Sequence, residues 1–334
     1  MTRISLAPCI VCGSDTTARK LQVHLMLQSR SSHLQLNRLL PAEMLGRETI
    51  YGMPLGYGPN PGPRQAAPSG EQHPGWNEVK TTTVTVLFKA PRELLASFLP
   101  HKSFTIDAHS EDAYASIVFT RLENLPWLAG RGYNHCGFYI HDVVCRGRDE
   151  QRRGKYLSVL FEDRADPITT GREQLGYAKV YASLDEVRRT DQLVIRLGWE
   201  ETVFGTMTLD GLQDVSLAAE GDAVPDSFTP SEGLLHFKYI PRTGGAGHDA
   251  MYPTFTPLPA ASTSVRQRAE TAACAKFEFV DLGFEKLPTL HHIAARLASL
   301  PTSNVIYAGM VEALGTTDIS EQRAIALDDG DCVL

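Results

Sequence analysis

Lys179 is the residue in this sequence whose surroundings favour chemistry most clearly. It follows Tyr177 and Ala178 and precedes Val180, so no carboxylate adjoins it along the chain. If the alternation of a strand turns its side chain inward, burial disfavours the ammonium form and lowers the pKa of the amine. A neutral amine near pH 7 can attack a ketone and form a Schiff base. The same pattern also fits an exposed lysine whose stem lies along apolar surface.

A short helix is expected immediately before Lys179. Thr170 and Glu173 have the spacing of a capping box, and Gly176 suits a helix end after little more than one turn. The helix would lie between a strand that ends near Phe161 and a strand that starts at Lys179. The backbone of this turn would then aim the lysine side chain.

Strand signals dominate the sequence from about residue 78 onward. β-Branched and aromatic residues between turn formers predict strands, whereas Leu290, Ile293, Ala294 and Leu297 have helical spacing. The predicted strands are 81–88, 114–119, 138–144, 156–161, 193–199, 202–209, 234–240, 275–280 and 304–311, and the predicted helices are 91–98 and 287–300. Many strands with few short helices predict an α+β or mostly-β sheet system closed around a core.

The composition is that of an ordinary globular protein. The chain has 334 residues, 43% hydrophobic and 21% charged, and a net charge of −7. This acidic balance gives no electrostatic footprint for nucleic acid or for anionic membranes, so neither is an expected partner. No apolar run reaches the length of about 18 residues that a membrane-spanning helix needs. Sparse, irregularly spaced cysteines and the lack of a convincing signal peptide predict a cytoplasmic protein.

Three regions are expected along the chain. Residues 1–77 form an N-terminal extension that is rich in Gly and Pro from residue 52, where a regular hydrogen-bonded ladder is disfavoured. Residues 78–315 form the catalytic domain, and residues 316–334 form an acidic C-terminal tail.

Metal and cofactor motifs do not occur with the required spacing. Cys9 and Cys12 have a zinc-type spacing, but His24 and His33 are too far apart to complete the site. The glycines near 56–62 and 244–247 lack the strand-to-helix context of a dinucleotide-binding loop. We therefore expect no metal and no organic cofactor.

Three sequence runs resemble the acetoacetate decarboxylase superfamily. They are Trp127-Leu-Ala-Gly-Arg-Gly-Tyr133-Asn, Gly154-Lys-Tyr-Leu-Ser-Val-Leu-Phe-Glu162 and Gly171-Arg-Glu-Gln-Leu-Gly-Tyr-Ala-Lys179. The similarity extends from about residue 78 to about residue 311. It implies a mostly antiparallel β-structure with a few short helices, closed as a cone or barrel around a buried pocket, that assembles as a homo-oligomer. It also implies that Lys179 is the lysine that forms an imine with the substrate.

The sequence departs from the family pattern around this lysine. The second family lysine is replaced by Val180, and a family glutamate is replaced by His135. Another family acid would lie near Ser116 and the family arginine near Lys80 or Thr81, where no acid and no arginine occur. In the family these groups surround the substrate carboxylate and the imine. Their loss argues against acetoacetate as the substrate.

The remaining candidates are a lysine, a histidine and several neighbours. Lys179 would be the imine-forming residue, and His135 would be catalytic as a proton carrier that titrates near neutrality. The candidate substrate-binding residues are Tyr133, Tyr177, Arg172, Glu173 and Trp127. Arg172 and Glu173 fit either the pocket rim or a structural role in the turn before Lys179.

These candidates predict a lyase-type enzyme that forms a lysine Schiff base with a ketone or β-keto substrate. The reaction would be decarboxylation, aldol or retro-aldol chemistry, or dehydration, carried out on a small-molecule carbonyl compound in secondary metabolism. Two alternatives stay open. One is a non-covalent cyclase or isomerase, pericyclase-like, that acts on a polyketide-derived substrate in the same pocket. The other is a non-catalytic binding protein on a retained scaffold.

Overall fold

The computed structural model describes residues 52–57, 73–107, 110–217, 231–258, 264–315 and 322–328. The chain divides into two compact units, Met1–Pro59 and Asn60–Leu334. In the first unit the described residues form one 3-10 turn, η2 (Leu55–Tyr57). Most of the expected N-terminal extension, including Cys9 and Cys12, and parts of the expected C-terminal tail lie outside the described residues.

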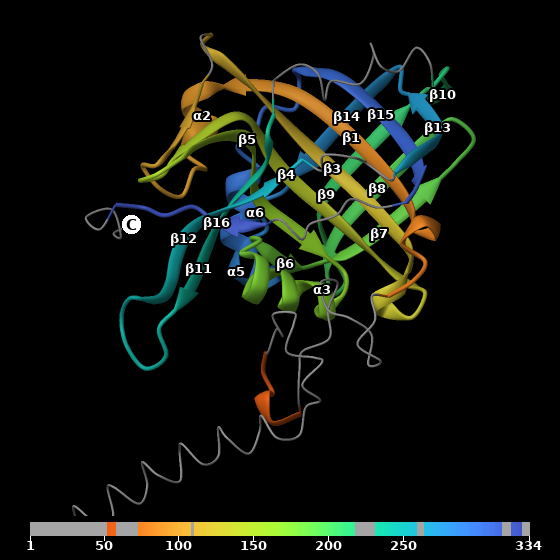
Figure 1. The fold of residues 1–334 in the computed structure, drawn as a ribbon. Coiled ribbons are helices and arrows are strands. Elements are labelled where there is room, and N and C mark those ends of the chain that lie inside the picture. Colours follow the sequence, from red (N-terminus) through yellow and green to blue (C-terminus); the bar gives the residue numbers. More distant parts are fainter. Residues whose placement is uncertain are drawn as a thin grey trace, which may run out of the picture. The chain divides into compact units, whose positions relative to one another are not determined.

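The second unit is built mainly from strands in two sheets (Figure 1). The larger sheet has 12 strands, in the order β10 (Gln213–Asp214), β13 (Val265–Thr271), β15 (Val305–Leu314), β1 (Lys80–Pro91), β3 (Asp112–Leu125), β4 (Arg131–Arg146), β5 (Gln151–Glu162), β11 (Gly233–Pro241), β12 (His248–Pro257) and β16 (Arg323–Ala324), with β2 (Phe104–Ile106) beside β4 and β6 (Lys179–Tyr181) beside β5. The smaller sheet has the order β14 (Cys274–Phe279), β9 (Thr202–Asp210), β8 (Gln192–Trp199) and β7 (Ser183–Arg188).

The helices within the described residues are few and short. They are α2 (Arg92–Ala96), α3 (Ala165–Thr170), α5 (Gly283–Lys286) and α6 (His291–Leu297), with 3-10 turns η3 (Trp76–Glu78) and η4 (Pro126–Leu128) and a π-helical turn η5 (Gly171–Leu175). None of the helices in the described ranges is both long enough and apolar enough to cross a membrane.

The expected fold class is confirmed in its main feature. The described neighbouring strands are antiparallel, apart from β5 with β11 and β5 with β6. The closed cone or barrel is not confirmed, because neither described sheet has a strand order that returns on itself. The larger sheet has β10 at one end and β16 at the other.

The main hydrophobic core lies between the two sheets. Phe88 of β1 packs on Phe277 of β14 with 4.6 Å between ring centroids, and Phe161 of β5 lies 5.3 Å from Phe204 of β9. Leu297 of α6 belongs to the same buried cluster. The aromatic rings therefore fix how the larger sheet packs on the smaller one.

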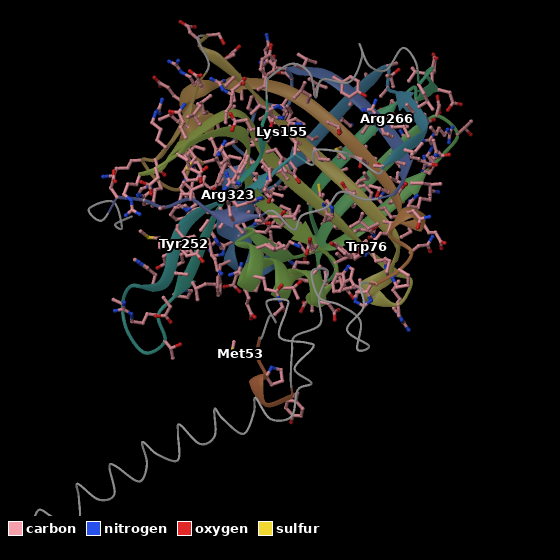
Figure 2. All side chains as sticks on the ribbon, viewed as in Figure 1. Met53, Trp76, Lys155, Tyr252, Arg266 and Arg323 are labelled. Atoms are coloured by element: carbon pink, nitrogen blue, oxygen red, sulfur yellow. The ribbon has the colours of Figure 1, made fainter. Side chains whose placement is uncertain are left out.

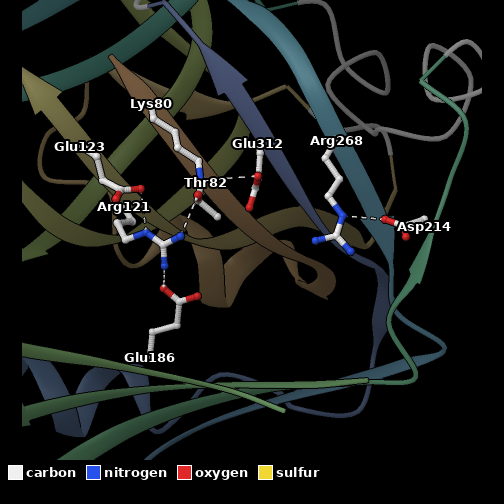
Figure 3. Close-up of polar contacts among 8 residues, drawn as sticks. All are labelled: Lys80, Thr82, Arg121, Glu123, Glu186, Asp214, Arg268 and Glu312. Carbon is white, nitrogen blue, oxygen red and sulfur yellow. Dashed lines mark hydrogen bonds and ion pairs between the residues drawn. The ribbon is translucent and has the colours of Figure 1, made fainter. Parts of the chain in front are cut away.

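One ion pair drawn in Figure 3 joins the two sheets, and the other polar contacts drawn there lie within the larger sheet. Arg121 of β3 donates hydrogen bonds to Thr82 of β1 at 3.2 Å and to Glu123 at 3.3 Å. It also forms an ion pair with Glu186 of β7 in the smaller sheet. The other pairs drawn are Lys80 with Glu312 at 3.7 Å and Arg268 with Asp214 at 2.7 Å. The Arg121 guanidinium is thus already paired with the carboxylates of Glu123 and Glu186.

Side-chain alternation in β4 and β5 separates this core from a second buried face. Cys136 pairs with Phe161, and both belong to the core cluster. The next pair, His135 with Glu162, therefore points to the opposite face of the sheet. The candidate site lies on that opposite face.

Candidate active site around Lys179

Strand register brings Lys179 to the same face of the sheet as His135 and Glu162. Lys179 pairs with Leu160, two residues before Glu162, and side chains two apart along a strand share a face. Lys179 is only 5% exposed and Glu162 is fully buried. The Lys179 side chain is therefore oriented inward.

The Lys179 amine has two polar contacts. Nζ lies 2.9 Å from Oε1 of Glu162 and donates a hydrogen bond to the carbonyl oxygen of Pro167 at 3.0 Å. It also lies 5.3 Å from the centre of the Tyr177 ring. Burial lowers the pKa of Lys179, and the charge of Glu162 opposes that shift in part. The amine is thus easier to deprotonate than an exposed lysine.

Glu162 is a site residue that sequence reasoning missed. Burial raises the pKa of its carboxyl group, although the positive charge of Lys179 acts in the opposite direction. Among the described residues, Lys179 is its one ion-pair partner, and neither carboxylate oxygen has a further hydrogen-bond donor. No second cation among the described residues pairs with Glu162, and the charge of the neighbouring Asp163 also raises the pKa of Glu162.

Two buried imidazoles lie close enough to Lys179 for its charge to affect them. Burial and the Lys179 charge lower the pKa of His135 to about 3 and that of His236, on β11, to about 3. Neither Nδ1 has a hydrogen-bond partner within the described ranges. The expectation that His135 titrates near neutrality is wrong, because burial keeps its imidazole neutral. A neutral imidazole can still pass protons between its two nitrogens.

Two tyrosines complete the group. The Tyr177 ring lies 4.0 Å from the His236 ring, and its hydroxyl lies 3.3 Å from Oγ1 of Thr256. The Tyr133 ring lies 6.2 Å from the His135 ring. Burial raises the pKa of Tyr133, so its phenol stays protonated and can donate a hydrogen bond. We define the Lys179 cluster as Lys179, Glu162, His135, His236, Tyr133 and Tyr177.

A cavity of about 320 Å³ adjoins the Lys179 cluster through Tyr133. Its lining consists of Arg121, Leu122, Glu123, Gly132, Tyr133, Asn134, Asp163 and Arg164. This volume is near the lower limit of about 300 Å³ for sites that hold small molecules. No group of three or more His, Cys, Asp or Glu side chains in the described ranges is placed to hold a metal ion.

The turn before Lys179 differs from the expected capping box. The helix begins at Ala165, so Thr170 is its last residue, and the Thr170 hydroxyl donates to the carbonyl oxygen of Asp166 at 3.0 Å. The helical segment continues as the π-helical turn η5 and is followed by Gly176. Gly176 has φ 77°, the left-handed conformation that is common where a helix ends. The helix end was therefore predicted correctly and the helix start was not.

Contacts from distant strands hold this turn. The carbonyl oxygen of Glu173 accepts a hydrogen bond from Lys238 at 2.5 Å, and that of Leu175 accepts one from Thr254 at 3.0 Å. Gln322, near the chain end, also donates to Leu175. The adjacent strand β16 pairs with β12, and its Arg323 side chain is labelled in Figure 2. The C-terminal segment thus supports the turn that carries the site.

Arg172 and Trp127 lie apart from the Lys179 amine. The Arg172 guanidinium donates to the backbone carbonyl oxygen of Lys179 at 2.8 Å. It also lines a second cavity, of about 270 Å³, with Ala178 and Val180. Since neighbours of Lys179 in the chain point away from its side chain, this cavity lies behind the strand. Trp127 lies half-buried in η4, and no hydrogen bond or ring contact joins it to the Lys179 cluster in the described part of the chain.

Gly171 shapes the space that the lysine side chain occupies. A Cβ atom on this residue would lie 2.5 Å from Cε and 2.7 Å from Nζ of Lys179. Gly171 has φ −66° and ψ −40°, an ordinary helical conformation. Backbone conformation therefore does not require glycine here. The close approach of Lys179 does.

Gly171→Ala should leave the chain folded but displace the Lys179 amine. Alanine fits a helical backbone, and the lysine end is flexible, whereas a displacement of about 1 Å can lower a reaction rate about 10²-fold. We expect the rate of imine formation at Lys179 to fall by about that factor, as measured by borohydride trapping and mass spectrometry. Gly245→Ala is the matched control, since a Cβ there meets no atom within 4 Å. Equal trapping rates in the two variants would contradict the prediction.

The free energy of unfolding should decrease as the pH falls from about 6.5 towards 3. His135 and His236 have a pKa of about 3 when folded and about 6.5 when exposed, so each gains a proton on unfolding in this range. Their contribution is complete above pH 6.5 and is lost as the pH falls through the folded pKa. His236→Gln should reduce the slope by about 1.4 kcal/mol per pH unit between pH 5 and 4.

Urea unfolding at stepped pH values measures that slope. His248→Gln is the control, because His248 is not among the buried residues. An unchanged slope in His236→Gln would show that this imidazole titrates normally.

Comparisons with known proteins identify the family and the fold. The sequence model of the family described as acetoacetate decarboxylase matches residues 58–317. One structure of an acetoacetate decarboxylase is similar at 14% identity and TM-score 0.56, covering 86% of this chain and 98% of that chain. The acetoacetate decarboxylase of Legionella pneumophila is similar at 15% identity and TM-score 0.50, covering 73% of this chain and 88% of that one.

A third similar structure is the enduracididine biosynthesis enzyme MppR in complex with pyruvate. It has 13% identity and TM-score 0.50, covering 79% of this chain and 98% of that chain. No curated protein sequence matches this chain significantly. At these identities the structural neighbours establish a shared fold.

Proposed function

The chain belongs to the acetoacetate decarboxylase family, and we propose that it is a lyase-type enzyme in which Lys179 forms a Schiff base with a ketone or β-keto compound. The observation that carries the proposal is the buried Lys179 amine, held between Glu162 and the Pro167 carbonyl, with a pKa lowered by burial. Such an amine loses its proton more readily than an exposed lysine, and its neutral form has the lone pair that attack on a carbonyl carbon requires.

The cluster residues have complementary roles in this proposal. The iminium formed on Lys179 withdraws electrons from the adjacent carbon, which permits loss of carbon dioxide, aldol or retro-aldol chemistry, or dehydration. His135 moves protons as a neutral imidazole. Tyr133 and Tyr177 bind and orient the substrate. Water then hydrolyses the imine and releases the product ketone.

The part of the chain that the structure describes gives no replacement for the missing family arginine near the amine. Arg121 lies across from Thr82 on the neighbouring strand, but Glu186 and Glu123 hold its guanidinium. Ser116, where a family acid was expected, forms a hydrogen bond of 2.9 Å with His141. These contacts support a substrate other than acetoacetate.

The metabolic setting, the substrate and the assembly of the protein are inferred mainly from its sequence. We propose secondary metabolism as the setting, a small-molecule carbonyl compound as the substrate and a homo-oligomer as the assembly. The similar enzyme MppR is a biosynthesis enzyme and binds pyruvate, which supports a biosynthetic role for this chain.

A second candidate function is a non-covalent cyclase or isomerase for a polyketide-derived substrate. The unpartnered Nδ1 atoms of His135 and His236 in the described structure favour it, since two buried neutral imidazoles can orient a substrate without a covalent bond. In that case Lys179→Met should keep substantial activity.

Borohydride trapping tests the Schiff base directly. The full chain is incubated with a panel of β-keto acids and 1,3-diketones and then reduced, and the adduct is located by peptide mass spectrometry. We expect a stable adduct on Lys179. No adduct on Lys179 in folded protein would reject the covalent mechanism in favour of the cyclase or isomerase.

A further inference from the structure

We infer that Glu162 restricts the site to uncharged carbonyl compounds and carries the protons of imine formation at Lys179. This inference rests on the proposed Schiff-base function and names its substrate class, which narrows the reaction to aldol, retro-aldol or dehydration chemistry because decarboxylation needs an anionic substrate. Three observations carry it: the contact between Glu162 and the reacting nitrogen, the burial of both side chains, and the lack of a second cation in the Lys179 cluster.

The contact places Glu162 at the reacting atom. Its Oε1 lies 2.9 Å from Nζ of Lys179, within the range for direct proton transfer. Both side chains are almost completely buried, so bulk water does not readily substitute for either group. His135 pairs with Glu162 across the strands and is neutral, so it adds no charge.

Imine formation balances with Glu162 as the only proton carrier. The ammonium proton of Lys179 passes to Glu162, and the nitrogen lone pair forms the C–N bond while the carbonyl π pair moves to oxygen. Glu162 protonates that oxygen and takes a second proton from nitrogen. It then protonates the hydroxyl group, the C–O bond breaks, water leaves, and the nitrogen lone pair forms the C=N bond. An ammonium and a carbonyl become a protonated imine and water, and Glu162 ends as a carboxylate.

The charge of the site is the same before and after this step when the substrate is neutral. One cation on the Lys179 nitrogen faces one carboxylate, Glu162, in both states. A β-keto acid would add a second buried anion beside Glu162. In the described structure the Arg172 guanidinium donates to the backbone oxygen of Lys179, Arg121 is held by Glu186, and Arg164 at the cavity pairs with Asp166 at 4.0 Å, so none of these three provides the missing cation. The like charges would repel, which selects against an acidic substrate.

Acetoacetamide and acetoacetate form a matched pair of probes for this charge selection. They have nearly the same shape, and only the second is an anion. Each is incubated with the full chain, reduced with cyanoborohydride, and the rate of adduct formation on Lys179 is measured by mass spectrometry. We expect acetoacetamide to react at least about tenfold faster than acetoacetate.

Glu162→Gln keeps the shape of the side chain and removes its charge. In this variant the preference for acetoacetamide should shrink to about twofold or less, and the absolute rate should fall about 10²-fold because the proton carrier is lost. The rate of the variant should also lose the dependence on pH that the Glu162 carboxyl group gives the wild type. Glu278→Gln, which changes an exposed carboxylate on β14, should leave rates and preference unchanged.

The outcomes separate this inference from the function on which it rests. An adduct on Lys179 from both probes at equal wild-type rates would overturn charge selection and leave the Schiff base standing. An unchanged preference in folded Glu162→Gln would do the same. No Lys179 adduct from either probe would overturn the Schiff base itself. If Glu162→Gln does not fold, the wild-type rates with acetoacetamide and acetoacetate still test the charge selection.

Discussion

Lys179→Arg should abolish the reducible adduct and the turnover while the protein stays folded. A guanidinium remains protonated and cannot add to a carbonyl carbon, but it keeps a positive charge opposite Glu162 and donors that can reach the Pro167 carbonyl. The buried carboxylate therefore keeps a cationic partner. Adduct mass after borohydride reduction and the thermal unfolding midpoint are measured on the same preparation.

Lys276→Arg is the control for this substitution. Lys276 is an exposed lysine of β14 in the smaller sheet, so its replacement should change neither adduct nor stability. Turnover that persists in folded Lys179→Arg would rule out the covalent mechanism. The buried imidazoles and tyrosines would then be the groups that act on the substrate.

The strands were predictable where local sequence determines them. Every region predicted as a strand contains one, because β-branched and aromatic residues alternate there against a core. Strands β7 and β13 were missed, since their exposed polar residues show no apolar period. Strand β12 was missed because Pro253 and Pro257 argue against a strand, whereas pairing with β11 and β16 overrides that signal.

The helices show the same division between local and distant causes. The expected helix at 287–300 occurs only over His291–Leu297, and the helix expected at 91–98 occurs over Arg92–Ala96. Apolar spacing located both, but their ends depend on packing against the sheets. In the turn before Lys179, the capping-box spacing of Thr170 and Glu173 is coincidental, because the helix had already begun at Ala165.

The sequence singled out four members of the Lys179 cluster, namely Lys179, His135, Tyr133 and Tyr177, but not Glu162 or His236. Lys179 stood out because its apolar neighbours and its motif lie together in the chain. Glu162 is the last residue of one of the three sequence runs that resemble the family. Its contact with Lys179, however, arises from the register of β5 with β6. His236 carries no sequence signal at all, since only the placement of β11 beside β5 brings it to the Lys179 cluster.

Lys179→Met should reduce the free energy of unfolding by about 3–5 kcal/mol near neutral pH. Removing one partner of a buried ion pair leaves the other charge unpaired, and this costs far more than losing an exposed pair. Without Lys179, burial and the charge of Asp163 act on Glu162 unopposed and raise its folded pKa further above the unfolded value. Stability from the protonated carboxyl is then present at low pH and lost as the pH rises through that pKa. The defect of Lys179→Met should therefore grow with pH.

The double variant Lys179→Met with Glu162→Gln should recover most of the stability that Lys179→Met loses. The growth of the defect with pH should also disappear. Glutamine is neutral, so no charge remains buried, and the methionine retains a similar volume. Urea unfolding of the wild type, both single variants and the double variant gives the coupling free energy, which we expect to exceed about 2 kcal/mol. Additive single effects would mean that Lys179 and Glu162 are not energetically coupled. The carboxylate could then neither hold the amine proton nor repel an anionic substrate, so this cycle tests the basis of the inferred specificity without any substrate.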